Sequence, residues 1–222
     1  MGSGPVLTDL FKRIKATPFT GKRRLVALVG APASGKSTLA EALAQMDPSI
    51  QVVPMDGFHL DNSILSERGI LHRKGAPETF DAAGFVHLVR RLRTEDGVVF
   101  PHFDRSRDQS IAGAGAVRPE TETILVEGNY LMLDIAPWQK LAPLWDLSVK
   151  IDVPLAVLRQ RLLQRWTDHG YTQAEAAGKA DGNDLPNATF VLENSLHCDV
   201  VVTADQVTDA PPSPPTPTHK VE

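Results

Sequence analysis

The sequence lacks several features that mark particular classes of protein. It has a single cysteine, Cys198, so an internal disulfide is excluded and a reducing compartment is favoured. No apolar run reaches the roughly 18 residues that cross a bilayer, and the first residues do not follow a signal-peptide pattern. The net charge of −4 provides no basic excess for nucleic acid. We therefore expect a soluble cytoplasmic protein that binds neither nucleic acid nor membrane.

What the sequence does contain is a repeated alternation of short apolar runs and amphipathic stretches. With 222 residues, 42% of them apolar, the chain can form one sizeable domain. The strand–helix repetition predicts an α/β fold with a mostly parallel sheet. Strands are predicted at residues 25–29, 51–55, 98–100, 124–126, 147–151 and 200–202, the fifth of them covered on one face only. Helices are predicted at residues 6–16, 39–46, 81–94, 154–166 and 188–196.

Three parts of the chain fall outside this alternation. Residues 57–80 and 167–185 are polar and contain glycine, and long connections inside a compact domain are usually lids or binding segments. The tail from Asp209 is rich in proline, which predicts disorder. We divide the chain into a leader helix (1–20), a domain (21–205) with a lid at about 160–185, and a tail (206–222).

One motif carries most of the functional information. Residues 30–37 fit the phosphate-binding pattern G-x-x-x-x-G-K-[ST], between a predicted strand and a predicted helix. There a curled loop turns successive N–H groups and the helix N-terminus toward phosphate oxygens, Lys36 reaches the β- and γ-phosphates, and Ser37 binds Mg²⁺. A plain glycine turn capped by Ser37 is the alternative. The expected nucleotide-binding residues are Gly30, Ala31, Pro32, Ala33, Ser34, Gly35, Lys36, Ser37 and Thr38.

The motif leaves GTPase, motor ATPase and small-molecule kinase open. Two short stretches resemble GTPase motifs, but the strand or the residue that should precede each motif is missing. Residues 81–84 fit D-x-x-G but follow no predicted strand, and Lys179 lacks the Asn or Thr that precedes the guanine-binding lysine. A kinase is therefore favoured.

Two acids follow predicted strands. Glu127 ends the strand at 124–126 and Asp56 ends the strand at 51–55, and the carboxyl ends of parallel strands share the edge where ligands bind. We expect Glu127 to hold Mg²⁺ with Ser37, largely through water. Transfer to an alcohol needs a carboxylate that accepts the hydroxyl proton, and we assign this role to Asp56. Either acid could instead be a turn residue.

Three arginines lie on the helix that leads into the 167–185 segment. Arg161 and Arg165 are four residues apart and share a face, with Arg159 nearby. We expect Arg161 and Arg165 to act catalytically from a lid that closes over the triphosphate and excludes water. A solvated basic helix face is the other interpretation.

Together, residues 30–37, Asp56, residues 126–131 and the arginine helix resemble the phosphoribulokinase, uridine kinase and bacterial pantothenate kinase group of P-loop kinases, over about residues 20–203. The resemblance implies a three-layer P-loop fold with a helical lid, ATP as donor, Mg²⁺ as cofactor, Asp56 as base and Glu127 near the metal. The stretches that look similar to a bacterial subgroup named fructose-transport-system kinase or fructokinase-like are 55–59, 73–81, 103–105 and 183–188.

The resemblance also implies acceptor-binding groups after Asp56 and around residues 101–105. Uridine kinases carry a tyrosine and a histidine where this chain has Phe103, Arg105 and Asp108, and pantothenate kinases are longer. Basic side chains in these loops suit an acceptor with a carboxylate or phosphate, or are ordinary surface charge. These basic residues are Arg73, Lys74, His102, Arg105 and Arg107.

Amides and an acid in the same segments could bind acceptor hydroxyls, or could cap turns and helices. They are Asp61, Asn62, Asn183 and Asn187. We expect a kinase that phosphorylates a small-molecule hydroxyl, first a sugar or sugar-like one, with a nucleoside or pantothenate as alternatives. A regulatory ATPase without an acceptor is the alternative of another class, and a homodimer is left open. The expected acceptor-site residues are Asp56, His59, Arg73, His102, Arg105, Glu127 and Asn187.

Overall fold

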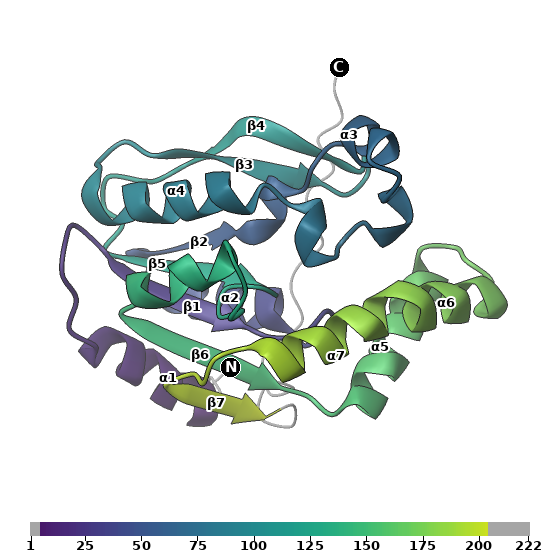
Figure 1. The fold of residues 1–222 in the computed structure, drawn as a ribbon. Helices are drawn as coiled ribbons and strands as arrows, with labels where there is room; N and C mark the ends of the chain where they lie inside the picture. Colours follow the sequence, from purple (N-terminus) through teal and green to yellow (C-terminus); the bar gives the residue numbers. More distant parts are fainter. Residues whose placement is uncertain (1–4, 204–222) are drawn as a thin grey trace, which may run out of the picture.

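A five-stranded parallel sheet forms the centre of the fold, as seen in a computed structural model that describes residues 5–203 (Figure 1). Its strand order is β2-β5-β1-β6-β7, and all four neighbouring pairs are parallel. The predicted α/β fold is confirmed. The strands are β1 Arg24–Val29, β2 Ile50–Pro54, β5 Thr123–Gly128, β6 Leu147–Asp152 and β7 Val200–Thr203.

The central strands are buried on both faces. All six residues of β1 and of β5 are buried, which explains their continuous apolar sequence. Strand β6 follows the predicted alternation at Lys150 and Asp152, which are half-buried, but departs from it at Ser148. Ser148 lies on the opposite face from Leu147 and Val149 but is also buried, and its hydroxyl donates to Asp199 at 2.7 Å.

Helices cover the sheet on both sides. One apolar cluster joins the sheet to α1 (Pro5–Ala16), α2 (Lys36–Met46) and α5 (Leu155–Asp168). The other joins it to α4 (Ala82–Thr94) and the 3-10 helix η4 (Trp138–Leu144). Helix α1, which we assigned to a leader, packs Leu10 and Ile14 into the first cluster. The sheet and its two helical layers form the three layers.

A hairpin stands outside the main sheet. Strand β3 (Val99–Asp104) pairs antiparallel with β4 (Gln109–Ala116). The prediction of a strand that joins the main alternation and stops at Pro101 was wrong, because β3 passes the proline through a register shift between Phe100 and His102. Strand β4 was missed because its run of alanine and glycine carries no apolar signal.

The two long polar segments contain short helices. Residues 57–80 hold the second half of η1 (Met55–Phe58) and all of α3 (Asn62–Glu67), η2 (Leu71–Arg73) and η3 (Pro77–Thr79). Residues 167–185 hold α6 (Gln173–Lys179) and the π-helix η5 (Ala180–Asp184), which runs into α7 (Leu185–Asn194). Sequence reasoning missed α6, although Thr172 and Glu175 form a capping box at its start.

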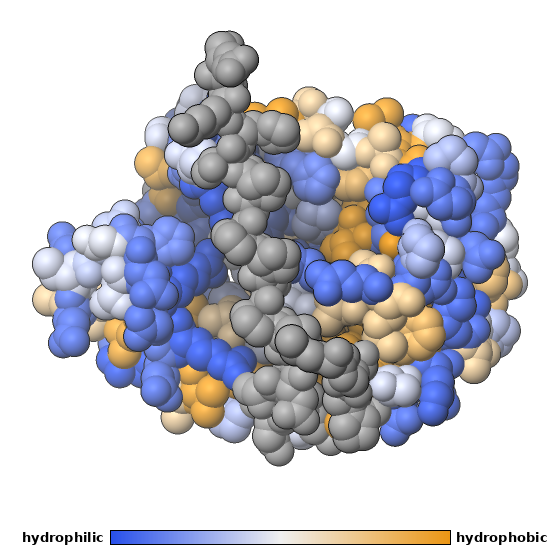
Figure 2. Space-filling view, turned by 180° about the vertical axis from the view of Figure 1, so that it is seen from behind, coloured by the Kyte–Doolittle hydropathy of each residue, from blue (hydrophilic) through white to orange (hydrophobic). Residues whose placement is uncertain are grey.

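Helices α5 and α6, η5 and the start of α7 project to one side of the sheet in Figure 1, and we call them the lid. The lid surface at the left of Figure 2 is mostly hydrophilic or neutral. In the described part of the chain, no helix is long and apolar enough to cross a membrane. The proline-rich tail that we predicted to be disordered lies outside the described residues.

Candidate functional site

The phosphate loop connects β1 to α2 and is shaped as an anion cradle. Ala33 and Gly35 have left-handed backbones, with φ of 63° and 99°, on either side of Ser34. Such alternation turns successive N–H groups to one side. A Cβ on Gly30 would lie 2.5 Å from the Ser34 hydroxyl oxygen, so the loop requires glycine there. That buried hydroxyl has no hydrogen-bond partner among the described residues. The loop therefore fits a bound phosphate.

Lys36 lies inside this cradle. Its ammonium donates to the Ala31 carbonyl at 3.0 Å, and the residue is 8% exposed. Burial lowers the pKa of Lys36, while the negative charges of Glu127 and Asp56 oppose that shift. A buried cation whose one hydrogen bond within residues 5–203 goes to a loop carbonyl is poised for an anionic ligand.

Glu127 and Ser37 face each other across the sheet edge. Strand β5 lies next to β1 and pairs Glu127 with Leu28, so the acid emerges beside the phosphate loop. The Ser37 hydroxyl donates to Oε1 of Glu127 at 3.3 Å. Burial raises the pKa of Glu127, and the positive charge of Lys36 opposes this.

These two oxygen donors fit a magnesium ion that arrives with a nucleotide. Within residues 5–203, no three or more His, Cys, Asp or Glu side chains are grouped to hold a metal by themselves. Mg²⁺ is usually held by one or two protein oxygens together with phosphates and waters. Ser37 and Glu127 match that donor set, so the residues present fit Mg²⁺ and a triphosphate.

Asp56 lies at the same edge, directly after β2. The register pairs Pro54 with Glu127, which places the residues that follow the two strands side by side. The Asp56 carboxylate is 26% exposed and accepts from the Arg105 guanidinium at 2.7 Å. Its charge acts on both Lys36 and Glu127. The structure thus brings together Asp56, Arg105, Glu127 and the phosphate loop.

The three lid arginines have different environments. Arg161 donates to the carbonyls of Ala33 and Ser34 at 3.3 and 3.2 Å, which ties α5 to the phosphate loop. Burial and the charge of Arg105 lower the pKa of Arg165, whereas Asp184 and Asp56 oppose this shift. Arg159 instead forms a two-pronged ion pair with Asp181, both bonds 2.8 Å. Arg161 therefore contacts the phosphate loop, Arg165 lies within range of the charges of Arg105 and Asp56, and Arg159 is engaged within the lid.

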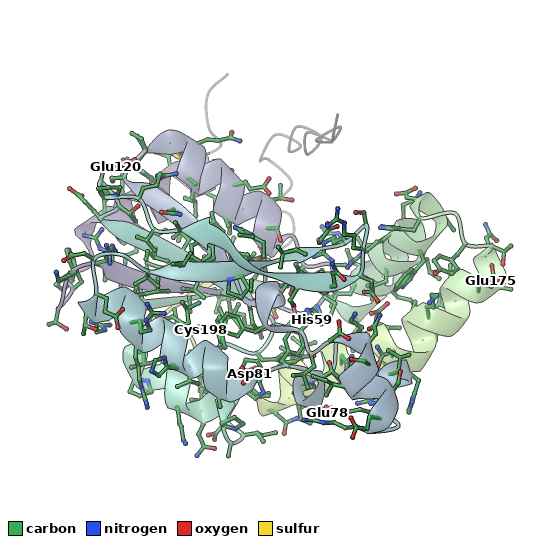
Figure 3. All side chains as sticks on the ribbon, turned by 90° about the horizontal axis from the view of Figure 1, so that it is seen from above. His59, Glu78, Asp81, Glu120, Glu175 and Cys198 are labelled. Atoms are coloured by element: carbon green, nitrogen blue, oxygen red, sulfur yellow. The ribbon has the colours of Figure 1, made fainter. Side chains whose placement is uncertain are left out.

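The His59 imidazole is held in a defined orientation. Its ring lies between those of Phe80 and Phe103, with centroid distances of 4.0 and 4.6 Å. Nδ1 lies 2.8 Å from the Asp56 carbonyl, which can only accept, so Nδ1 carries the hydrogen. Burial lowers the pKa of His59, which favours the neutral ring. Figure 3 shows His59 close to the hairpin and Glu175 at the far end of the lid.

The other predicted acceptor residues lie in different surroundings. Arg73 pairs with Glu78 at 3.3 Å. His102 alternates with Phe103 along β3, so it faces away from His59, and its ring lies at 54° to that of Phe100 with a centroid distance of 5.2 Å. Asn187 is buried in α7 and donates to Asn183 at 3.3 Å. The described contacts of these three residues do not include Asp56 or the phosphate loop.

Sequence reasoning missed several contacts that build the site. Trp166 donates its indole N–H to Asp184 at 2.6 Å, and burial raises the pKa of Asp184. The Tyr130 hydroxyl donates to the Gly75 carbonyl. This bond ties residues 57–80, which we call the acceptor segment, to the end of β5. The 183–188 stretch was singled out only by its resemblance to a kinase subgroup, and no local pattern identifies partners 18 or 55 residues apart.

Comparisons with known proteins identify relatives of the chain in sequence and in fold. No protein-family model matches the chain. An uncharacterized Escherichia coli protein, YggC, is 38% identical over 187 residues, which cover 82% of this chain and 78% of that protein. A Schizosaccharomyces pombe protein described as a "putative uridine kinase" is 35% identical over 196 residues, covering 82% and 83%. A crystal structure of a "putative fructose transport system kinase" from a Silicibacter species is 46% identical with a TM-score of 0.83, covering 91% and 99%.

Proposed function

Because the chain belongs to the P-loop kinases, we propose that it transfers the γ-phosphate of ATP to a hydroxyl group of a small metabolite, a sugar or sugar-like compound. The observation that carries the proposal is the position of Asp56. Its partly exposed carboxylate lies beside the phosphate loop and Glu127, at an edge where an acceptor hydroxyl and a γ-phosphate can meet.

Each residue of the site has a role in this reaction. The loop N–H groups and Lys36 bind the phosphates, and Ser37 with Glu127 would hold Mg²⁺, which supplies positive charge against the phosphate oxygens. Asp56 accepts the hydroxyl proton while the acceptor oxygen bonds to the γ-phosphorus. The bond from that phosphorus to the bridging oxygen breaks, and ADP leaves. Arg161 and Arg165 exclude water and stabilise the transferring group.

The sugar assignment draws on the relative named as a fructose transport system kinase, which is similar over 91% of this chain. A nucleoside acceptor is the alternative, supported by the relative named as a uridine kinase. The pantothenate kinases that match are more than twice as long as the aligned region, since the match covers 46% of one from Clavibacter michiganensis. Their acceptor is accordingly the weaker alternative.

The test is an ATP-consumption screen against sugars, nucleosides and pantothenate-like acids. Asp56→Asn keeps an oxygen for Arg105 but removes the base, so turnover on the best acceptor should fall by about 10²–10⁴-fold at unchanged ATP affinity. Asp61→Asn is the control, because Asp61 caps α3 in the same segment. Normal turnover of Asp56→Asn would overturn the base assignment. ATP use that no acceptor stimulates would favour a regulatory ATPase.

A further inference from the structure

Four of the five basic side chains that we singled out near the acceptor segment already have a carboxylate partner within the protein. From sequence alone the five suggested an anionic acceptor. Burial lowers the pKa of the fifth, His102, which favours its neutral form. The four ion pairs are Arg73–Glu78 at 3.3 Å, Lys74–Asp108 at 2.9 Å, Arg105–Asp56 at 2.7 Å and Arg107–Asp104 at 3.6 Å.

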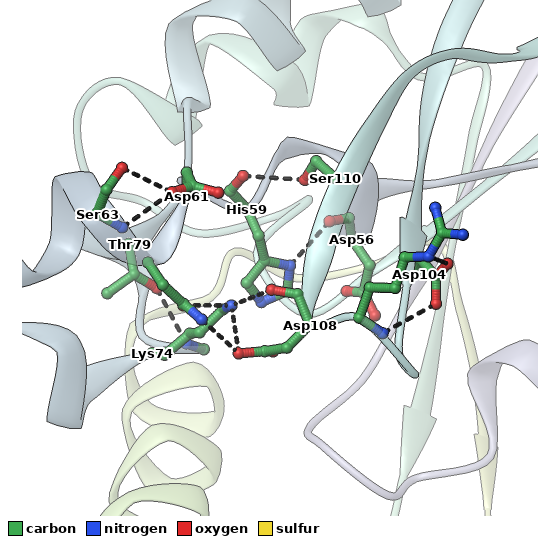
Figure 4. A network of polar contacts seen from close by, with 12 residues as sticks. Asp56, His59, Asp61, Ser63, Lys74, Thr79, Asp104, Asp108 and Ser110 are labelled. Carbon is green, nitrogen blue, oxygen red and sulfur yellow. Dashed lines mark hydrogen bonds and ion pairs between the residues drawn. The ribbon is translucent and has the colours of Figure 1, made fainter.

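Lys74 is the most completely satisfied of these cations (Figure 4). Its ammonium nitrogen lies 2.7 Å from the Asn62 side-chain oxygen, 2.8 Å from the Asp108 carbonyl and 2.9 Å from the Asp108 carboxylate. Two of the three N–H donors of the ammonium make hydrogen bonds to the Asn62 oxygen and the Asp108 carbonyl, and the Asp108 carboxylate pairs with its charge. The Lys74 side chain is only 15% exposed. A carboxylate or phosphate of an acceptor would therefore have to displace these contacts to bind Lys74.

Several segments of the chain hold this pair in place. Asp108 has a left-handed backbone, φ 53°, in the turn between β3 and β4. The Asn62 amide also donates to the Asp108 carboxylate at 2.8 Å. Asn183, from the π-helix of the lid, donates to the Lys74 carbonyl at 2.9 Å. The pair is therefore built by the hairpin, the acceptor segment and the lid together, which sets it apart from a chance surface contact.

Arg105 is a poor anchor for an anionic acceptor for a different reason. It neutralises Asp56, whose negative charge acts on the buried Glu127. An anionic acceptor that bound Arg105 in place of Asp56 would leave the carboxylates of Asp56 and Glu127 with one neighbouring cation fewer. Like charges at close range disfavour that state.

The groups that stay available at the acceptor side accept hydrogen bonds. Nε2 of His59 makes no hydrogen bond within residues 5–203, and with the hydrogen on Nδ1 it carries a lone pair. The carboxylate of Asp56 adds further acceptor positions. Such groups need partners that donate, and hydroxyl groups do so without bringing charge.

We propose that the acceptor site selects a neutral polyhydroxy compound over acids and phosphate esters, and that the Lys74–Asp108 pair sets this selection. The inference rests on the proposed kinase function, because it names the acceptor class of that same site. Lys74 and Asp108 are specificity-determining residues in this view, since the pair removes the cation that an acid would need.

The experiment measures ATP consumption by the full chain with matched acceptors that differ only in a CH₂OH group against a carboxylate. Suitable pairs are glucose and glucuronate, glucitol and gluconate, and panthenol and pantothenate. For the pair with the best acceptor, kcat/KM of the neutral member should exceed that of the acid by about tenfold or more. Preference for the acid would overturn the inference and leave the kinase function standing. Only the absence of stimulation by these six compounds and by the nucleosides of the wider screen would contradict the kinase function itself.

Asp108→Asn tests the pair directly. Asparagine tolerates the left-handed backbone and can still bond to Lys74, but the Lys74 charge is no longer compensated. The neutral-to-acid ratio of kcat/KM should fall about threefold to tenfold, because an acid now finds a cation. Adding Lys74→Met to Asp108→Asn should restore the ratio.

Asp104→Asn is the matched control, since it removes a carboxylate from the same turn without touching Lys74. Its ratio should equal that of the wild type. An equal fall in both single variants would mean that the general charge of the turn, and not the pair, sets selectivity. If Asp108→Asn does not fold, the matched acceptors on the wild-type chain still decide whether the site prefers a neutral compound.

Discussion

The Arg105 guanidinium lies 2.7 Å from the Asp56 carboxylate, although the two residues are 49 positions apart in the chain. Asp56 follows a strand of the main sheet, whereas Arg105 begins the turn of the hairpin. This ion pair joins the proposed base to the hairpin that borders the acceptor segment. Arg105 is 58% exposed, so the pair can open without disturbing the core.

Replacement of Arg105 should therefore affect the acceptor more than the nucleotide. We expect Arg105→Ala to lower kcat/KM for the acceptor by about tenfold, because a charge-assisted hydrogen bond to the base is lost at a largely exposed position. Arg105→Lys should recover part of the loss, and steady-state kinetics with varied acceptor measure both. Arg107→Ala, in the same turn, is the control. A comparable loss in that control, or an equal loss of ATP affinity in Arg105→Ala, would contradict the assigned contact.

The Ser37–Glu127 contact predicts a specific magnesium dependence. Ser37→Ala removes the hydroxyl that lies 3.3 Å from Glu127, while Ser37→Thr keeps a hydroxyl there. The Mg²⁺ concentration for half-maximal activity should rise about tenfold or more in the alanine variant and stay close to wild type in the threonine variant. Titration of ATP turnover with Mg²⁺ tests this. Equal magnesium requirements in all three proteins would remove Ser37 from the metal site.

Replacing each of the two lid arginines, Arg161 and Arg165, should affect ATP binding and turnover differently. Arg161 bonds to phosphate-loop carbonyls, so Arg161→Ala should weaken ATP binding as well as activity. Arg165 makes no such bond to the loop among the described residues, and Arg165→Ala should lower turnover by about 10²-fold with a smaller effect on ATP affinity. Equilibrium nucleotide binding and kcat give the comparison. An Arg165 variant that loses affinity but keeps turnover would rule out the catalytic lid role.

His59 should make stability depend on pH. Burial lowers its folded-state pKa below the ordinary 6.5, with Lys74 and Arg105 adding to the shift and Asp56 opposing it. The folded protein then binds the proton less tightly than the unfolded chain does. The neutral His59 ring therefore contributes fully to stability above about pH 6.5, and this contribution is lost as the pH falls from there through the folded-state pKa of His59.

The measurement is urea unfolding between about pH 7.5 and pH 5. The free energy of unfolding of the wild type should fall more steeply with acid than that of His59→Asn, by on the order of 1 kcal/mol. Asparagine retains a donor for the Asp56 carbonyl, so the difference between the two pH dependences reports the protonation of His59 alone. His87→Asn, at an exposed position on α4, should follow the wild type. Parallel slopes for wild type and His59→Asn would refute the prediction.

Much of the fold could be read from local patterns. The five strands of the main sheet were predicted because strands buried on both faces appear as continuous apolar runs, as in β1 and β5. The hairpin could not be predicted, since β4 is built from small residues that carry no periodic signal, whereas α6 has a local signal in the capping box of Thr172 and Glu175. The phosphate loop was predictable for a further reason: consecutive N–H groups form it, so its chemistry is contiguous in sequence.

The sequence by itself thus determined the phosphate loop, the parallel sheet and the two acids that follow its strands. Tertiary structure alone decided which cations stay available, because ion pairs such as Lys74–Asp108 join segments 34 residues apart. It also turned His102 away from His59, since neighbouring residues of a strand face opposite sides. A sequence gives the charge of each side chain, but whether a partner cancels that charge depends on how distant segments pack.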